Sequence, residues 1–267
     1  MIKLLILCFA LFANFAVAQT VNINGHTADL FLSGNKGDST VVYFPGCNGK
    51  DSMGVKYQDF HMEKIKAQWN GRVNIVRLQL VNDLTQGAQN GSCFWDTKTA
   101  NERGLNSYKF SNAIGDIATQ WIPKQDWYNG NVHFFGFSYG GRVAMFVNSV
   151  RATNGAFKTV TSIWPICIEA QRFAGTTVHT PTRIYSGERD PISSPKNCPT
   201  FYQNTNSNLE LVLYNTDKHS WMTHPTFTNQ RVWWPNHKLW TESAYDAELA
   251  DKTWASWTQW AKSKEIN

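Results

Sequence analysis

A glycine-flanked serine stands out among the residues that could carry chemistry. The segment Gly136-Phe137-Ser138-Tyr139-Gly140 follows an apolar run at 132–135 and precedes an apolar stretch with helical spacing. A serine at such a strand–turn–helix corner projects from the backbone, and glycine two residues to either side removes side chains that would collide. The start of the following helix offers N–H groups and partial positive charge where an oxyanion would develop. The pattern predicts that Ser138 is a nucleophile.

A serine hydroxyl needs a general base, and the base needs an acid that orients it. Where this motif is catalytic, an acid and then a histidine follow the serine along the chain. Asp190 ends a segment at 182–190 in which a strand runs into a turn, and His219 follows the strand predicted at 209–214. We therefore expect Asp190 as the acid and His219 as the base. Glu188 and His224 are the alternatives for these two roles.

Two backbone amides are the candidates for stabilising an oxyanion. The glycine-rich turn Pro45-Gly46-Cys47-Asn48-Gly49 follows a short strand at 40–44, and such turns can point N–H groups inward at low steric cost. We expect the amides of Cys47 and Tyr139 to form this pair. His133 lies within the strand before Ser138, where a buried imidazole with satisfied hydrogen bonds is expected. Structural roles are also expected of His26, His61, His179 and His237.

Strand-like and helix-like segments alternate along the chain. We expect a hairpin within 21–32 around Asn24-Gly25, strands at 40–44, 73–80, 132–137, 159–164, 182–185 and 209–214, and helices at 53–69, 101–121, 139–150 and 244–262. Such alternation indicates an α/β fold with a mainly parallel sheet covered by helices on both faces. Ligands of these sheets bind at the carboxyl ends of the strands, where Ser138, Asp190 and His219 would lie.

The N-terminal segment predicts export from the cytoplasm. A positive start at Met1-Ile2-Lys3 is followed by an almost wholly apolar run at 4–15 and by Ala16-Val17-Ala18, a small-x-small cleavage pattern. We expect residues 1–18 to be a signal peptide, residues 19–267 to form a single domain, and the protein to be secreted or periplasmic. The apolar run is too short to span a bilayer, so no stable membrane insertion is expected.

Composition argues against several other classes of protein. The net charge of +5 is spread along the chain, without the basic runs interleaved with aromatic residues that nucleic-acid binders use. The absence of a C-x-x-C pair gives zinc ribbons and thioredoxin chemistry little support, and no metal is expected. An even number of cysteines behind a signal peptide predicts two disulfides, with every pairing open on spacing alone. These cysteines are Cys47, Cys93, Cys167 and Cys198.

Several segments together resemble the dienelactone hydrolase family, in particular its secreted, serine-bearing relatives. They are the turn at 45–49 (with proline where the family has histidine), the corner at 136–141, the acid-bearing turn at 187–190, His219, and Tyr245-Asp246 before the closing helix. The resemblance covers nearly all of the chain after residue 18 and implies the α/β-hydrolase fold. It also implies two disulfides, Cys47 with Cys93 and Cys167 with Cys198.

The nucleophile departs from the family's namesake, which uses a cysteine where this chain has Ser138. This difference favours a general carboxylic-ester hydrolase over an enzyme for dienelactone itself. We expect an acyl-enzyme mechanism that needs no metal or organic cofactor and acts on small-molecule or polymer esters. The alternatives are an amidase, a peptidase or an acyltransferase on the same triad, or a non-catalytic secreted binding protein of the same fold. The sequence sets no oligomeric state.

Tryptophans near the predicted base are candidates for a substrate pocket. Trp221 lies two residues after His219, and Trp164 ends the strand predicted at 159–164. Aromatic side chains near a catalytic loop can line an acyl or sugar pocket. The tryptophan-rich region at 221–240 could instead pack as an irregular insertion, which is the expectation here, or belong to a polysaccharide-binding module.

Overall fold

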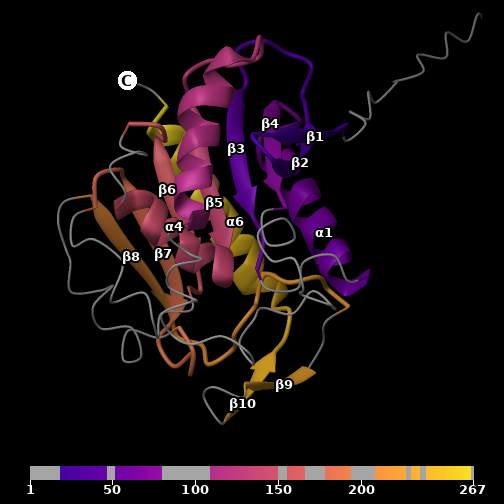
Figure 1. The fold of residues 1–267 in the computed structure, drawn as a ribbon. Helices are drawn as coiled ribbons and strands as arrows, with labels where there is room; N and C mark the ends of the chain where they lie inside the picture. Colours follow the sequence, from indigo (N-terminus) through magenta and orange to yellow (C-terminus); the bar gives the residue numbers. More distant parts are fainter. Residues whose placement is uncertain are drawn as a thin grey trace, which may run out of the picture.

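The apolar runs of the sequence form an eight-stranded sheet in the computed structural model (Figure 1). The structure describes residues 19–46, 52–79, 109–149, 155–165, 178–193, 208–226, 230–234 and 239–265. The strand order is β1-β2-β4-β3-β5-β6-β7-β8. β2 pairs antiparallel with β1 and β4, and every other pairing in this sheet is parallel. The carboxyl ends of β3 to β8 therefore lie together, and we call this side of the molecule the carboxyl end of the sheet.

The element bounds agree closely with the predicted segments. The strands of the sheet are β1 (Gln19–Ile23), β2 (His26–Phe31), β3 (Ser39–Phe44), β4 (Val73–Leu78), β5 (Val132–Phe137), β6 (Thr159–Ile163), β7 (Thr182–Gly187) and β8 (Leu209–Tyr214). The main helices are α1 (Ser52–Gln68), α4 (Tyr139–Ser149) and α6 (Ala247–Ser263). The predicted single-domain α/β fold is confirmed.

The opening hairpin and the helix before β5 follow from local backbone chemistry. Asn24 and Gly25 both have positive φ, at 53° and 88°, as the tight turn between β1 and β2 requires. Residues 109–116 are α-helical and continue into a π-helical turn, η1 (Ile117–Trp121), and a 3-10 turn, η2 (Ile122–Lys124). Pro123 fits near the start of η2 because its missing N–H has no helical partner there. The first part of the predicted helix, 101–108, lies outside the described residues.

The closing helix starts later than the sequence predicts. α6 begins at Ala247 instead of 244, because the side chain of Asp246 accepts a hydrogen bond from the Leu249 amide and caps the helix. Its buried face carries Trp254 and Trp257. Asp246 therefore fixes both where the helix begins and which aromatic residues face the sheet.

The expectation of an irregular insertion at 221–240 is wrong for its second half. Residues Gln230–Trp234 (β9) and Leu239–Ser243 (β10) form an antiparallel pair in which Trp233 lies opposite Trp240. Both segments hold the β-branched and aromatic residues that favour strands, which outweighs the weak hydrophobic alternation. Figure 1 shows this pair beyond the carboxyl end of the main sheet.

Side chains alternate across the sheet and build a core on each face. On one face, Val42 and Phe134 pack with residues of α4 and of the helix at 109–122. On the other, Tyr43, Phe135 and Phe137 pack with residues of α1 and α6. The second core is strongly aromatic, so the strand that leads to Ser138 is held on that face by rings from both covering helices.

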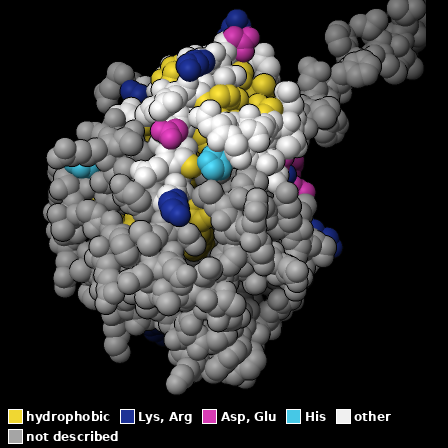
Figure 2. Space-filling model, viewed as in Figure 1, with side chains coloured by type: hydrophobic (Ala, Val, Ile, Leu, Met, Phe, Trp, Pro, Cys, Tyr) yellow, Lys and Arg dark blue, Asp and Glu magenta, His cyan; other side chains and the backbone are white. Residues whose placement is uncertain are grey.

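Among the described residues on the face drawn in Figure 2, charged side chains do not gather by sign. Lysine and arginine are scattered among acidic and uncharged groups there, in agreement with the dispersed charge of the sequence. Among the residues that the structure describes, no helix is both long and apolar enough to cross a membrane.

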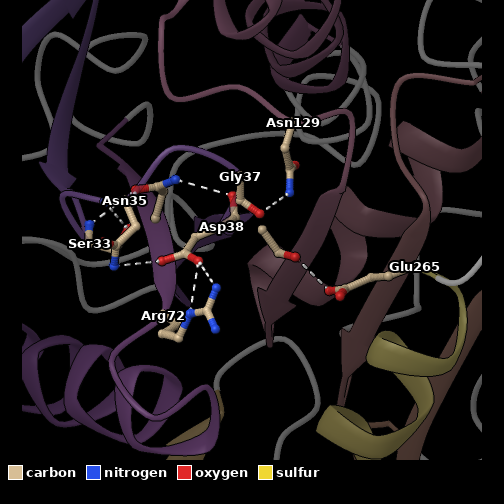
Figure 3. Close-up of polar contacts among 9 residues, drawn as sticks. Ser33, Asn35, Gly37, Asp38, Arg72, Asn129 and Glu265 are labelled. Atoms are coloured by element: carbon tan, nitrogen blue, oxygen red, sulfur yellow. Dashed lines mark hydrogen bonds and ion pairs between the residues drawn. The ribbon is translucent and has the colours of Figure 1, made fainter.

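Glu265 joins the end of the chain to the amino ends of the strands (Figure 3). Its Oε1 accepts a hydrogen bond from Ser39 Oγ at 2.8 Å and lies 2.9 Å from His133 Nε2. The other ring nitrogen of His133 contacts Thr159 Oγ1 at 2.8 Å, so this buried imidazole has the satisfied role predicted for it. Burial alone raises the pKa of the Glu265 carboxyl, but the hydrogen bonds from His133 and Ser39 outweigh it and the pKa is lowered.

We expect Glu265→Gln to lower the free energy of unfolding at pH 7 by about 1–3 kcal/mol, because a neutral amide replaces a hydrogen-bonded carboxylate. Since the folded pKa is depressed, the carboxylate's contribution is present above the unfolded pKa and is lost as pH falls through the folded pKa. Urea unfolding of both proteins between pH 7 and pH 3 measures this. The exposed Glu63, changed to Gln, is the control. A difference that does not shrink in acid would contradict the prediction.

Candidate active site

Ser138 lies in a sharp corner between β5 and α4, as its glycine-flanked sequence predicts. Its φ is +49°, a left-handed conformation that costs a non-glycine residue free energy and is held by the surrounding structure. A Cβ on Gly136 would lie 2.1 Å from the Gly140 carbonyl oxygen, and a Cβ on Gly140 would lie 2.3 Å from the Phe44 carbonyl oxygen. Only glycine fits at these two positions, so the corner depends on both.

The corner is fixed to the neighbouring strands by its backbone. The Ser138 amide donates to the Ile163 carbonyl oxygen at the end of β6, at 2.9 Å. On the β3 side, a Cβ on Gly46 would lie 3.3 Å from Ser138 Cβ and 3.7 Å from the Tyr57 hydroxyl. Gly46, which follows β3, therefore lies against the serine. Cys47, the donor predicted in the turn at 45–49, lies outside the described residues, whereas Tyr139 begins α4.

Asp190 and His219 are in direct contact. His219 Nδ1 lies 2.8 Å from Asp190 Oδ2, and both side chains are almost fully buried. Asp190 follows β7 and His219 follows β8, which are parallel neighbours, so the two loops leave the carboxyl end of the sheet side by side. A carboxylate only accepts hydrogen bonds, and the proton of a neutral imidazole in this pair is therefore on Nδ1.

The structure distinguishes both residues from the alternatives considered for their roles. Glu188 is exposed, whereas Asp190 is fully buried. His224 Nδ1 contacts the Thr226 hydroxyl at 2.8 Å, whereas His219 contacts the buried carboxylate.

Asp190 is surrounded by donors. Its Oδ1 accepts from the backbone amides of Ile192 and Ser193, at 2.8 and 3.1 Å, and its Oδ2 accepts from the Ser193 hydroxyl at 2.5 Å. Burial acts to raise the pKa of this carboxyl, but the charge and hydrogen bond of His219 and the bonds from Ser193 and Ile192 outweigh it, so the pKa is lowered. Asp190 is therefore held as a carboxylate. The sequence analysis missed Ser193; the sequence signal here is Asp190 itself, since an aspartate in a turn commonly accepts hydrogen bonds from the backbone a few residues on.

Trp164 and Trp221, the predicted pocket residues, lie beside His219 but inside the protein. Trp164 is 2 % exposed and Trp221 is 0 % exposed. The Trp164 ring lies edge-on to His219, with centroids 6.0 Å apart, and its centroid is 4.8 Å from that of Trp221. Trp164 also has a φ of +34°, a strained value for a bulky residue. Trp164 thus packs against the histidine and Trp221 packs against Trp164, and their pocket role stays a prediction.

Residues 215–226, which we call the His219 loop, are anchored by both helices of the aromatic face. The Trp221 carbonyl accepts from the Asp246 amide at 3.0 Å, and Lys218 Nζ donates to Asp246 Oδ2 at 3.0 Å. From α1, His61 Nε2 lies 2.7 Å from the Met222 carbonyl oxygen. Within the described residues, no group of three or more histidine, cysteine, aspartate or glutamate side chains could hold a metal ion.

The model of the dienelactone hydrolase family matches residues 94–264, well over half of the chain. The chain belongs to the dienelactone hydrolase family. It is therefore a member of a family of hydrolases, and the resemblance seen in its motifs is confirmed. No curated protein matches the chain.

Several solved structures have the same fold as this chain. A dienelactone hydrolase-like promiscuous phosphotriesterase from metagenomic libraries superposes with a TM-score of 0.63 at 13% identity, covering 92% of this chain and 97% of that one. A Klebsiella pneumoniae protein assigned as a dienelactone hydrolase gives 0.64 at 12% identity, with 92% and 98% covered. A Mesorhizobium loti carboxylesterase gives 0.56 at 10% identity, with 74% and 90% covered. At these identities the similarity shows the fold.

We expect Ser193→Ala to lower the free energy of unfolding at pH 7 by roughly 1–3 kcal/mol, because the buried Asp190 carboxylate loses its hydroxyl donor. Urea unfolding measures the change. Ser263→Ala is the matched control, since that serine is exposed and should stay within about 0.5 kcal/mol of the wild type. Equal effects of the two substitutions would show that the Ser193 hydroxyl does not support Asp190.

Proposed function

We propose that this member of the dienelactone hydrolase family is a secreted serine hydrolase that cleaves carboxylic esters. Ser138 is the nucleophile, His219 the general base and Asp190 the residue that orients it. The observation that carries the proposal is the buried 2.8 Å contact between His219 and Asp190, at the end of the sheet where Ser138 lies in a strained corner.

The topology supports bringing the three residues together. β5, β6, β7 and β8 are consecutive parallel strands, and the three side chains follow β5, β7 and β8. Trp164, after β6, lies between them: its ring centroid is 5.2 Å from that of Phe137, which precedes the serine, and 6.0 Å from that of His219. Ser138, Trp164, Asp190 and His219 thus follow the four consecutive strands β5, β6, β7 and β8.

The hydrogen bond to Asp190 assigns the histidine its role. With the proton on Nδ1, Nε2 carries the lone pair that can take a proton from a hydroxyl. The Asp190 carboxylate also stabilises the imidazolium that forms, because its lowered pKa keeps it charged. His219 is thereby prepared to act as a base without changing its orientation.

Hydrolysis then proceeds through an acyl-enzyme. As Ser138 Oγ bonds to the ester carbonyl carbon, its proton passes to His219 Nε2. The tetrahedral intermediate collapses, the C–O bond to the alcohol breaks, and the imidazolium gives its proton to the leaving oxygen. Water repeats the sequence on the acyl-enzyme: His219 takes its proton, the acid is released, and the proton returns to Ser138. In each half, the amides of Tyr139 and Cys47 are the proposed oxyanion donors.

Carboxylic esters are the substrate class that the family and its neighbours favour. The similar Mesorhizobium loti protein is a carboxylesterase, and the metagenomic neighbour is a promiscuous phosphotriesterase. Ester hydrolysis is also the reaction favoured by a serine in place of the namesake's cysteine. Small-molecule and polymer esters are both included in the proposal.

The catalytic assignment is tested with p-nitrophenyl esters of increasing acyl length. We expect measurable turnover by the wild type, a loss of roughly 10⁴-fold or more in kcat for Ser138→Ala, and a loss on the order of 10³- to 10⁴-fold for Asp190→Asn because the histidine loses its orienting acceptor. Ser263→Ala should retain activity. A fluorophosphonate probe should label the wild type on Ser138 alone. Full activity of Ser138→Ala, or labelling elsewhere, would overturn the assignment.

Export and disulfide formation are part of the same proposal. The predicted cleavage precedes Gln19, where β1 begins. The cysteines proposed to pair, Cys47 with Cys93 and Cys167 with Cys198, lie outside the described residues. The first bridge would fasten the oxyanion turn, and each closed loop would contribute about 3–4 kcal/mol by the chain-entropy estimate.

We expect the exported protein to start at Gln19 and non-reducing peptide mapping to recover the two proposed cystine peptides. N-terminal sequencing of protein from the culture medium and the periplasm, compared with the cell lysate, measures the first outcome and also locates the protein. Retention of residues 1–18, or a peptide joining Cys47 to Cys167 or Cys198, would contradict this part of the proposal.

A further inference from the structure

One buried histidine outside the proposed triad contacts both segments that carry catalytic residues. His61 lies on α1 and is 1 % exposed. Its Nδ1 lies 2.8 Å from the Tyr43 hydroxyl on β3, and its Nε2 lies 2.7 Å from the Met222 carbonyl oxygen in the His219 loop. Its ring stacks on Phe137, with centroids 4.1 Å apart and planes 19° apart. Phe137 directly precedes Ser138, and Met222 follows His219 by three residues.

The hydrogen bonds of His61 fix its tautomer. A carbonyl oxygen can only accept, so Nε2 carries the proton that is donated to Met222. Nδ1 is then the acceptor of the Tyr43 hydroxyl proton. Burial lowers the pKa of the imidazole to about 3, although the Met222 hydrogen bond acts to raise it, so the ring is neutral at the pH of most enzyme assays. A neutral ring with a defined donor and acceptor makes a directional contact to each partner.

The hydrogen bond from His61 to the Met222 carbonyl is a polar contact in an aromatic environment. Rings of Tyr57, Phe137 and Trp254 surround His61. A phenyl or aliphatic side chain could fill such a site without the desolvation cost of a buried imidazole. What the imidazole adds is a donor for the Met222 carbonyl. The adjacent Trp221 carbonyl accepts from the Asp246 amide at the start of α6. Two consecutive carbonyls of the His219 loop are thus held by the two helices that cover this face.

We propose that His61 is a positioning residue, which sets the distance between His219 and Ser138 by joining the His219 loop to the strand that ends at the nucleophile. This inference rests on the proposed function. The contacts of His61 described above do not include the reacting atoms; it acts through Phe137 on one side and Met222 on the other. A displacement of about 1 Å between nucleophile and base can lower the rate a hundred-fold, so a contact that fixes both segments affects turnover.

Two substitutions at position 61 separate the hydrogen bond from the packing. His61→Phe keeps an aromatic ring against Phe137 but loses both hydrogen bonds. His61→Gln loses the ring but can donate to Met222 and accept from Tyr43 through its amide. We expect His61→Phe to lower kcat on a p-nitrophenyl ester by roughly ten- to a hundred-fold with KM nearly unchanged, and His61→Gln to recover part of this loss. A role in packing alone predicts the opposite order and no separation of kcat from KM.

His133→Phe is the matched control. His133 is also fully buried and makes two hydrogen bonds, but at the amino ends of the strands, far along β5 from Ser138. It should lose stability and keep kcat. Tyr43→Phe supplies a second variant if those at position 61 do not fold: Nδ1 loses its donor while the rest of the contact stays, and kcat should fall several-fold.

The outcomes distinguish this inference from the proposed function. If the fluorophosphonate probe fails to label wild-type Ser138, the proposed function fails. If the wild type is labelled but His61→Phe, His61→Gln and Tyr43→Phe all react at the wild-type rate, the positioning role fails and the proposed function stands. An equal loss of kcat in His133→Phe also overturns the positioning role, since any buried histidine would then have the same effect.

Discussion

The site depends on how closely the backbones around Ser138 approach one another. The Cα atoms of Gly136, Gly140 and Gly141 each lie so near a carbonyl oxygen of a neighbouring segment that an added Cβ would fall within 2.1 to 2.7 Å of it. Ser138 lies in this tightly packed corner in a left-handed conformation, with a φ of +49°. Without these close contacts, the chain could pass from β5 into α4 through a wider turn, and the hydroxyl would have no defined direction.

The proposed base, His219, is positioned differently from the proposed nucleophile, Ser138. Ser138 is fixed by sterics within a few residues of sequence, whereas His219 is fixed by partners from distant elements. Asp190 holds the ring, Asp246 holds the backbone of its loop from α6, and His61 holds it from α1. A short-range steric constraint and a long-range set of hydrogen bonds therefore meet at the carboxyl end of the sheet. A shift of the Ser138 corner or of the His219 loop would change the distance between the two side chains.

These two kinds of constraint explain what could be predicted from the sequence. The sharp corner at Ser138 and the alternation of strands and helices follow from local patterns, because glycine spacing and hydrophobic periodicity can be read within a few consecutive residues. The same holds for the loops that carry Asp190 and His219. The contacts of His61 could not be predicted in this way. A histidine within a helix gives no sign that it contacts a carbonyl more than 150 residues later, since that contact exists only after the sheet has formed.

The β9–β10 pair was missed for a related reason. Its aromatic residues fit a strand, a packed insertion or a ligand surface equally well, and the pairing of Trp233 with Trp240 decides between them only in three dimensions. The start of α6 was predicted less accurately than those of α1 and α4, because a side-chain cap decides it. Asp246 moved the start of α6 by three residues, and the same aspartate proved to anchor the His219 loop.

The position of α6 at the end of the chain has a consequence for biosynthesis. The corner at Ser138 and the helix that follows it are complete once residue 149 has been made. Asp246, which anchors the His219 loop, and α6, which covers the aromatic face, follow about a hundred residues later. Chains grow from the N-terminus, so the nucleophile segment emerges well before the helix that steadies its partner. A nascent chain that stops before Asp246 therefore contains Ser138 and the corner that holds it, but lacks the contacts that hold the His219 loop.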